Sequence, residues 1–304
     1  MQPVRGILLM IAAVSIFTVM AAFIKASASI PAGQQVFFRA FCGIPVIVLW
    51  LAWRGEVWAG LRVQSYRGHI VRGLSGSCAM GLGFLGLKYI PLPEATAIRF
   101  ATPILVVVFA TLILGERIRA FRITAVVVGL LGVLIVMWPQ LSFAGGELAR
   151  LGAIVTLISA GLAALAQVFI KAMAATERTE AIVFWFSTTA SVLALFSIPF
   201  GWVWPMGWDW FWLIGSGLIG GAGQILLTSS YRYADAGTLA PFTYVAMIWA
   251  LLIGYFVFGE EPTLAMLFGA ALVIAAGVAI VLRERALGKP TTADAKIRTM
   301  MKNG

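Results

Sequence analysis

The sequence has little charge, one histidine and two cysteines. Only 11% of its 304 residues are charged, whereas an average soluble domain is about 25% charged. A water-soluble fold of this chain would therefore have too little charge to cover its surface. His69 has no cysteine, serine or aspartate placed to partner it, and no cluster of histidine, cysteine and carboxylates has metal-ligand spacing. We therefore expect no enzyme active site, no metal site and no cofactor.

Apolar residues are abundant instead. They make up 61% of the chain, and the mean hydropathy is +0.98. A helix needs about 20 mostly apolar residues to cross a bilayer. The sequence predicts an all-α membrane protein with ten transmembrane helices, at residues 6–25, 33–53, 69–89, 94–115, 121–138, 149–172, 180–201, 209–232, 237–259 and 263–282.

The chain repeats itself. Residues 6–26 align with residues 152–172, and residues 73–118 align without gaps with residues 217–262. The alignment predicts two five-helix repeats, residues 1–140 and 148–285, followed by a basic, disordered cytoplasmic tail at 286–304. Because five is odd, the second repeat enters the membrane upside down. A signal peptide is the alternative for the first run, but its apolar core is too long.

The placement of lysine and arginine predicts the orientation. The net charge is +10, which also suggests a nucleic-acid partner as an alternative. With the amino terminus inside, 17 of the 22 lysines and arginines flank the inner ends of the runs and three flank the outer ends. This asymmetry predicts that both termini are cytoplasmic. We expect a multi-pass protein of the cell inner (cytoplasmic) membrane, in contact with the lipid bilayer and not with nucleic acid.

Two arginines lie inside apolar runs, where a charge is costly and indicates a water-filled cavity or a partner. Each is about one and a half turns from the outer end of its run, so snorkelling toward the headgroups is the alternative for Arg39 and Arg99. Arg99 also shares one helical stripe with Thr96, Thr102 and Pro103. Pro103 is expected to free a backbone carbonyl at mid-membrane.

The second half carries uncharged polar groups at similar depth. Gln224, Thr228 and Tyr231 form one stripe, while Gln167 stands alone in its run and Thr243 is the repeat counterpart of Arg99. Hydrogen bonds between helices are the alternative interpretation of these groups.

The remaining features are two aromatic side chains beside a proline, boundary glutamates and packing glycines. Tyr244 and Trp249 lie beside a kink expected near Pro241. Glu116 and Glu260 are interpreted as boundary residues, and the glycines of the third and eighth runs as packing residues.

Three stretches resemble the drug/metabolite transporter superfamily, specifically its ten-helix EamA type. They are Phe37 to Arg39, Pro103 followed by Leu114 to Arg117, and Ala240 to Glu260. The last stretch is similar to the subgroup of bacterial riboflavin and S-adenosylmethionine uptake carriers. The resemblance implies a central cavity between the two halves and alternating access without chemistry. Arg39 matches the arginine that the family carries in its second helix.

The resemblance and the polar residues together predict a carrier. The expected substrate-binding residues are Phe38, Arg39, Arg99, Gln167, Gln224, Tyr231, Thr243, Tyr244 and Trp249. Two intramembrane arginines disfavour a permanent cation and favour a neutral or anionic small molecule. A planar aromatic solute could stack on the aromatic side chains, so riboflavin uptake is the leading prediction.

Other functions remain open at this point. They are export of amino acids or related metabolites, S-adenosylmethionine uptake, and, outside the carrier class, a membrane-embedded enzyme or a channel. The runs hold no mid-membrane carboxylate to carry a proton, which favours uniport or exchange; Glu94 is the nearest candidate. The sequence does not predict an oligomeric state.

Overall fold

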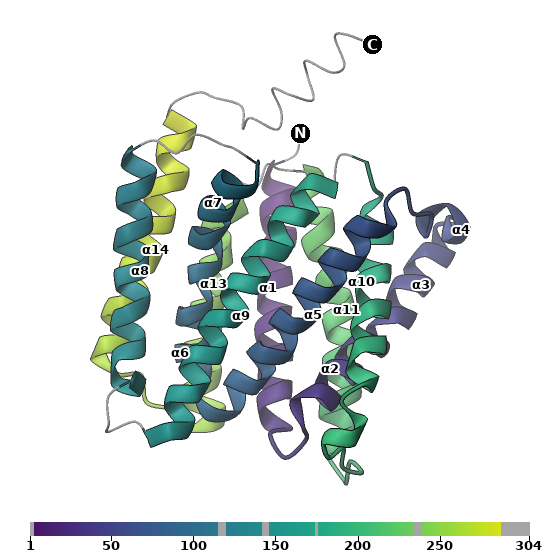
Figure 1. Cartoon of the computed structure of the whole chain (residues 1–304), viewed down its shortest axis with the longest axis horizontal. Coiled ribbons are helices and arrows are strands. Elements are labelled where there is room, and N and C mark those ends of the chain that lie inside the picture. The colour runs from purple at the N-terminus through teal and green to yellow at the C-terminus, as the bar shows by residue number, and fades with distance from the viewer. Residues whose placement is uncertain (1–2, 115–119, 142–145, 174–175, 234–238, 287–304) are drawn as a thin grey trace.

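The structure, a computed structural model, describes residues 3–114, 120–141, 146–173, 176–233 and 239–286. These residues form a bundle of helices that lie side by side, and α1 begins at the same end of the bundle where α14 ends (Figure 1). We call this the terminal end. The opposite end, where α1 and α13 finish, is called the distal end. The predicted cytoplasmic tail lies outside the described residues.

The expectation of an all-helical fold is confirmed for the described part of the chain. The helices are α1 (Pro3–Ala26), α2 (Ala32–Phe41), α3 (Gly43–Trp53), α4 (Val57–Gly60), α5 (Tyr66–Tyr89), α6 (Leu92–Arg99), α7 (Ala101–Leu114), α8 (Ala120–Leu141), α9 (Gly146–Met173), α10 (Thr179–Leu195), η2 (Ile198–Phe200), α11 (Asp209–Tyr233), η3 (Ala240–Tyr244), α13 (Val245–Phe258) and α14 (Leu264–Ala286). Five helical stretches in this part are long and apolar enough to cross a membrane, counting α2 and α3 together, and four shorter apolar helices accompany them. The count of ten transmembrane helices stays a prediction.

Two runs that were expected to be continuous helices are broken. The second run breaks at Cys42, between α2 and α3, and the fourth breaks at Phe100, between α6 and α7. Pro45 and Pro103 are each the third residue after the break. A proline has no amide hydrogen, and its ring clashes with the carbonyl four residues earlier, so the interruption falls one turn before the proline itself. The kink expected near Pro241 is confirmed as the 3-10 helix η3.

The tightest helix pairings join the first half of the chain to the second. They are α5 with α9, α1 with α11, and α8 with α14. Glycines allow several of these approaches, as expected: a Cβ on Gly223 of α11 would lie 3.1 Å from Ile16 of α1, and one on Gly83 would lie 2.9 Å from the Ser159 hydroxyl. Gly83 belongs to the sequence pattern Gly81-x-Gly-x-x-Gly86, which therefore packs α5 against α9.

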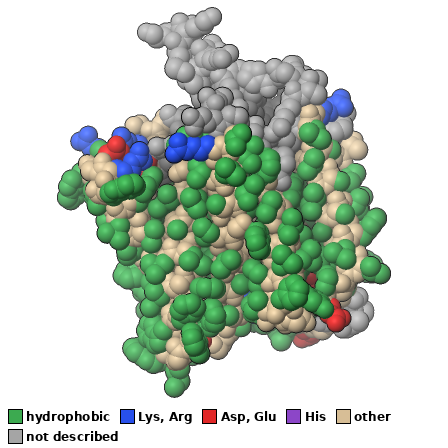
Figure 2. Space-filling view, turned by 180° about the vertical axis from the view of Figure 1, so that it is seen from behind, with side chains coloured by type: hydrophobic (Ala, Val, Ile, Leu, Met, Phe, Trp, Pro, Cys, Tyr) green, Lys and Arg blue, Asp and Glu red, His purple; other side chains and the backbone are tan. Residues whose placement is uncertain are grey.

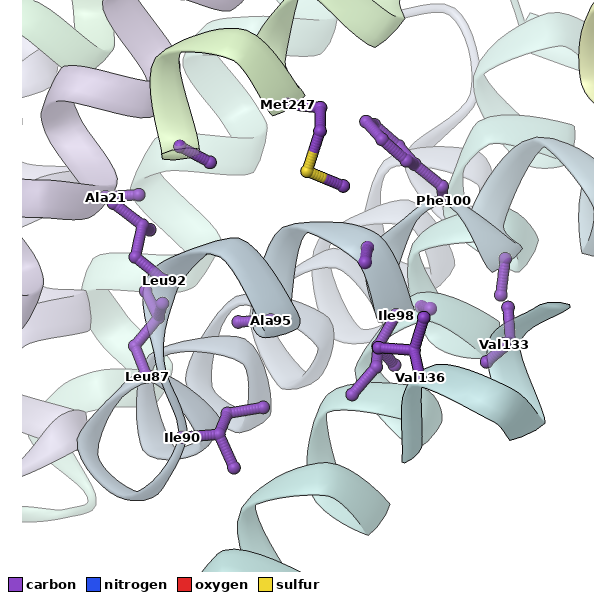
Figure 3. Close-up of a cluster of buried hydrophobic side chains, with 14 of the residues drawn as sticks. Ala21, Leu87, Ile90, Leu92, Ala95, Ile98, Phe100, Val133, Val136 and Met247 are labelled. Carbon is purple, nitrogen blue, oxygen red and sulfur yellow. The ribbon is translucent and has the colours of Figure 1, made fainter. Parts of the chain in front are cut away.

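The largest apolar core surrounds α6. Figure 3 shows Leu92, Ala95 and Ile98 of this helix among side chains from α1, α8 and α13, including Ala21 and Met247. The exterior is also apolar: hydrophobic side chains cover most of the face in Figure 2, with Lys and Arg gathered near one end. A surface of this kind matches contact with lipid along the sides of the bundle.

The α8–α14 contact gives a stability prediction. A Cβ on Gly269 would lie 2.5 Å from the carbonyl oxygen of Gly132, and backbone cannot move aside as a side chain can. We expect Gly269→Ala to destabilise the protein by about 1–3 kcal/mol through overpacking, seen as a lower melting temperature in detergent. Gly161→Ala in α9 is the control, because nothing lies within 4 Å of the added carbon. Equal melting temperatures for both variants would contradict the packing role.

Candidate functional site

Arg39 is buried inside the bundle. Only 5% of the residue is exposed. Its guanidinium packs on α11, where a Cβ on Gly220 would lie 3.3 Å from Nε, and Met20 of α1 reaches the same glycine. Among the described residues, Nε has no hydrogen-bond partner and Arg39 forms no ion pair. Arg39 therefore points into the protein and does not snorkel toward a headgroup layer.

Arg72 is a second buried arginine, which corrects the sequence interpretation. The sequence analysis counted it among the basic residues flanking the membrane, but it lies inside α5 with 7% of its surface exposed. Its Cζ atom lies 4.1 Å from the centre of the Phe186 ring of α10. The signal was present in the sequence, because position 72 falls within the third apolar run.

Arg99 differs from its neighbours in exposure. Ile98 and Phe100, on either side of it in the chain, are buried, yet the Arg99 side chain itself is exposed. Arg99 is also the last residue of α6, directly before the break at Phe100. The exposed Arg99 side chain therefore stands among buried residues at this break.

The other members of the Arg99 stripe bond to backbone. The Thr96 hydroxyl donates to the Leu92 carbonyl oxygen at 2.8 Å, and the Thr102 hydroxyl donates to the Ala160 carbonyl oxygen at 3.3 Å. Both are local or helix-to-helix hydrogen bonds of the kind that stabilise packed helices. Within this stripe, Arg99 is the residue with open surface.

Phe38, Tyr244 and Trp249 are the rings on which an aromatic solute was expected to stack, and two of these three are packed against other rings. Phe38 lies 5.7 Å edge-on from Trp210 of α11, and Tyr244 lies 5.0 Å edge-on from Phe100 with only 8% of the residue exposed. Trp249 is 39% exposed. Trp249 is therefore the one of the three with substantial surface to offer a solute in this structure.

The structure separates the predicted residues into two groups. Because α6 packs against α9 and α13, Arg99 lies on the central helix of a set that also carries Gln167 and Trp249. Because α2 packs against α11, Phe38 and Arg39 belong with Gln224. Gln167 is exposed, whereas Gln224 and Thr243 are half-buried. The side chains of Tyr231 and Thr228 lie outside those that the structure describes.

At the distal end, Lys25 and Glu260 form an ion pair that sequence reasoning missed. The Lys25 Nζ lies 2.8 Å from Glu260 Oε1, and the two side chains are 14% and 13% exposed. The sequence analysis interpreted Glu260 as a boundary residue and counted Lys25 as an outer flank. Their pairing could not be seen, because they stand at the ends of α1 and α13, more than 200 residues apart.

At the terminal end, Glu177 anchors the start of α5. Its Oε1 accepts hydrogen bonds from the Ser65 and Gln64 amides at 2.6 and 2.9 Å, and its Oε2 lies 3.4 Å from His69 Nε2. Burial alone raises the pKa of the Glu177 carboxyl, but these amides and the imidazole outweigh it and leave the pKa below its usual value. His69 is thus buried beside a carboxylate.

Two cavities stand out in the described part of the chain, and both lie at the terminal end. The larger, about 570 Å³, is bounded by Trp50, Trp53, Arg54, Ser229 and Tyr233. The second, about 440 Å³, is bounded by Ala59, Arg62, Val63, Gln64, Glu177 and Arg178. Neither is lined by a predicted substrate-binding residue.

Comparison with known proteins identifies the family. The sequence profile of the EamA-like transporter family matches residues 4–138 and, a second time, residues 150–283. The chain belongs to this family. The resemblance to the drug/metabolite transporter superfamily is therefore confirmed, and the chain is a multi-pass membrane protein of a transporter family.

Named relatives of this EamA-like protein are transporters too. The pseudopaline exporter CntI of Pseudomonas aeruginosa is 31% identical over 280 residues, covering 90% of this chain and 95% of the relative. The S-adenosylmethionine uptake transporter of Rickettsia prowazekii is 26% identical over 255 residues, covering 83% of each. A solved crystal structure superposes with a TM-score of 0.67 over 93% of this chain, at 21% identity, which shows the fold.

The Glu177 anchor gives a pH prediction. A carboxyl whose pKa is lowered on folding stabilises the protein above its unfolded pKa, and that stability is lost as pH falls through the folded pKa. Loss of the charged hydrogen bonds in Glu177→Gln should cost about 1–3 kcal/mol at pH 7. Because the reference pKa is 4.5 and the folded value lies below it, the melting-temperature gap between wild type and variant should shrink below about pH 4.5. A gap that stays constant from pH 7 to pH 3.5 would contradict this.

Glu56→Gln is the control, because Glu56 lies in an exposed pair with Arg178. Its loss should change the melting temperature little.

Proposed function

We propose that this chain is a secondary carrier that moves a small neutral or anionic organic metabolite across the cytoplasmic membrane by alternating access. The observation that carries the proposal is Arg99, an exposed cation between buried residues at the α6–α7 break. Membership of a transporter family supplies the class of function. In the proposed carrier, Arg99 faces the cavity and supplies a binding group within it.

The distribution of charge supports the choice of substrate class. Arg39 and Arg72 are buried in α2 and α5, and Arg99 ends α6 at its break with α7. Every carboxylate in the described part lies in a loop or in the first or last turn of a helix. The middle of the bundle is therefore positive, which repels a permanent cation and attracts an anion. The substrate proposed here differs for this reason from S-adenosylmethionine, a cationic sulfonium compound.

Riboflavin stays an untested prediction. Neither named relative above is a flavin carrier, and two of the three rings on which a flavin was expected to stack are packed against Phe100 and Trp210. Riboflavin is retained as a neutral aromatic probe. The direction of transport also stays open in this proposal, because one relative is named as an exporter and another as an uptake transporter.

We propose further that both termini are cytoplasmic and that residues 1–140 and 148–285 form inverted repeats. The lysine and arginine asymmetry supports this orientation. The structure is compatible with it, because α1 begins and α14 ends at one end of the bundle. The distal end would then face the outside. Without a mid-helix carboxylate among the described residues, uniport or exchange is favoured over proton symport.

Flux measurements test the substrate class. In proteoliposomes, we expect saturable uptake of neutral or anionic probes, with riboflavin, glutamate and S-adenosylmethionine as the neutral, anionic and cationic members of the panel. Arg150→Ala is the control variant and should take up the same probes as the wild type, because Arg150 is an exposed arginine in the second turn of α9. Saturable uptake of S-adenosylmethionine with no flux of the other classes would contradict the proposal.

Cysteine labelling tests whether Arg99 faces water. In a background with Cys42→Ser and Cys78→Ser, Arg99→Cys should react with a membrane-impermeant, water-soluble thiol reagent in native membranes. Val127→Cys should not react, because Val127 of α8 is 51% exposed on an apolar helix and would face lipid. Both positions are open in the structure, so the contrast separates an aqueous cavity from a lipid surface. Equal reactivity at the two positions would reject the cavity.

A further inference from the structure

The distal end of the bundle is held together by one polar junction. Lys25 is in the last turn of α1, and Glu260 follows Gly259, whose φ of 66° ends α13 in a left-handed turn. Between them lies the corner that joins α5 to α6, at residues 90 and 91. Three separate segments of chain therefore meet at this junction, two from the first half and one from the second.

Each charge of the pair also bonds to a helix terminus. The Lys25 ammonium donates to the Ile90 and Leu87 carbonyl oxygens, at 2.9 and 3.3 Å, at the carboxyl end of α5. Glu260 Oε2 accepts from the Leu92 amide at 2.9 Å, at the amino end of α6. A cation at a helix carboxyl end and an anion at a helix amino end are both favourable. The backbone on each side thus determines which position of the pair carries the positive charge and which carries the negative charge.

An apolar layer lies directly beneath the junction. Ile24, Ile90 and Leu92 are each at most 2% exposed, and Figure 3 shows Leu92 beside Ala21 of α1. Helices α6 and α13 are also in close contact, because a Cβ on Gly254 would lie 2.8 Å from Pro93. The helices α1, α6 and α13 are therefore in mutual contact.

The terminal end has a different arrangement. Its ion pairs, Arg54 with Glu180 and Arg178 with Glu56, join α10 and its preceding loop to the region around α3 and α4. They do not involve α1, α6 or α13. At this end α1 makes a cation–π contact instead, because the Arg5 Cζ atom lies 4.5 Å from the centre of the Tyr233 ring of α11.

We propose that Lys25 and Glu260 are the gating pair of the transport cycle: the pair closes the distal end in this conformation and must break for α13 to separate from α1 and the α5–α6 corner. The inference rests on the proposed carrier function. An ion pair that is made in one conformation and broken in the other contributes to the free-energy difference between the two conformations. Removing either partner should shift the population toward a state open at the distal end.

Distance measurements on purified protein test this without a substrate. Spin labels at Ala28→Cys and Glu261→Cys, both exposed, report the separation of α1 from α13 by double electron–electron resonance in the Cys42→Ser, Cys78→Ser background. We expect Lys25→Ala and Glu260→Gln each to raise the ratio of long to short distances by on the order of tenfold. The double variant should show no further increase, since both changes remove one interaction.

Controls separate gating from general loosening. Glu56→Gln makes the same chemical change at an exposed pair of the terminal end, and should leave the distance distribution unchanged. Lys25→Arg keeps the charge and should retain most of the short population. If Lys25→Ala does not yield folded protein, Glu260→Asp, which shortens the side chain by one methylene, provides the same readout. Unchanged distances in both single variants, or an equal change in Glu56→Gln, would overturn the proposal.

The charge swap tests the role of the helix termini. In Lys25→Glu with Glu260→Lys, a carboxylate would face the Leu87 and Ile90 carbonyls and an ammonium would face the Leu92 amide. Both contacts are repulsive, so the swap should stay open even though the pair is formally restored. A swap that recovers the wild-type distances would show that the pair acts by charge alone and would overturn this part.

Failure of the flux experiment with an intact distance response would reject the proposed substrates and leave the gate standing.

Discussion

The cost of removing a charge from water governs where every ionic group of this chain lies. The described carboxylates lie in loops or in the first or last turns of helices, and backbone amides or cations neutralise several of them. Two carboxylates, Glu177 and Glu260, and one ammonium, Lys25, bond to backbone groups at helix termini or turns. These three side chains therefore also link one segment of the chain to another. The arginines inside helices depart from this pattern. Arg39 and Arg72 are buried without carboxylates among the described residues, and Arg99 is exposed between buried neighbours.

Close helix packing explains how such a bundle can hold together and still change conformation. Glycines let α8 approach α14 and α5 approach α9 at backbone distance, and these pairs each join the two halves of the chain. Pairs packed this tightly move as units, because packed interfaces have discrete arrangements and do not deform continuously. Around Arg99 the helices are shorter and broken, at Phe100 and at η3. In the proposed cycle, motion is concentrated at these breaks and at the Lys25–Glu260 junction, between regions that stay packed.

Much of the fold could be predicted from the sequence, because apolar runs and their duplication are local and repeating signals. The glycine contacts and the kink near Pro241 follow from the same kind of signal. The prediction of continuous helices at 33–53 and 94–115 was wrong, because the chain breaks at Cys42 and Phe100. Each break lies one turn before a proline, since a proline interrupts the hydrogen bonds of the preceding turn. The candidate site was harder to predict. Arg72 and Glu260 were misinterpreted because their partners, Phe186 and Lys25, come close only in the folded bundle.

The central claim is that the enclosed, positive interior binds a neutral or anionic solute. The most direct test is the melting temperature of purified wild-type and Arg99→Ala protein against a metabolite panel, since a ligand that binds only the folded state raises it. The account predicts that the stabilising compounds are neutral or anionic and that Arg99→Ala loses the response while keeping its own unliganded melting temperature. A panel in which a permanent cation stabilises the protein most, equally in wild type and variant, would contradict it.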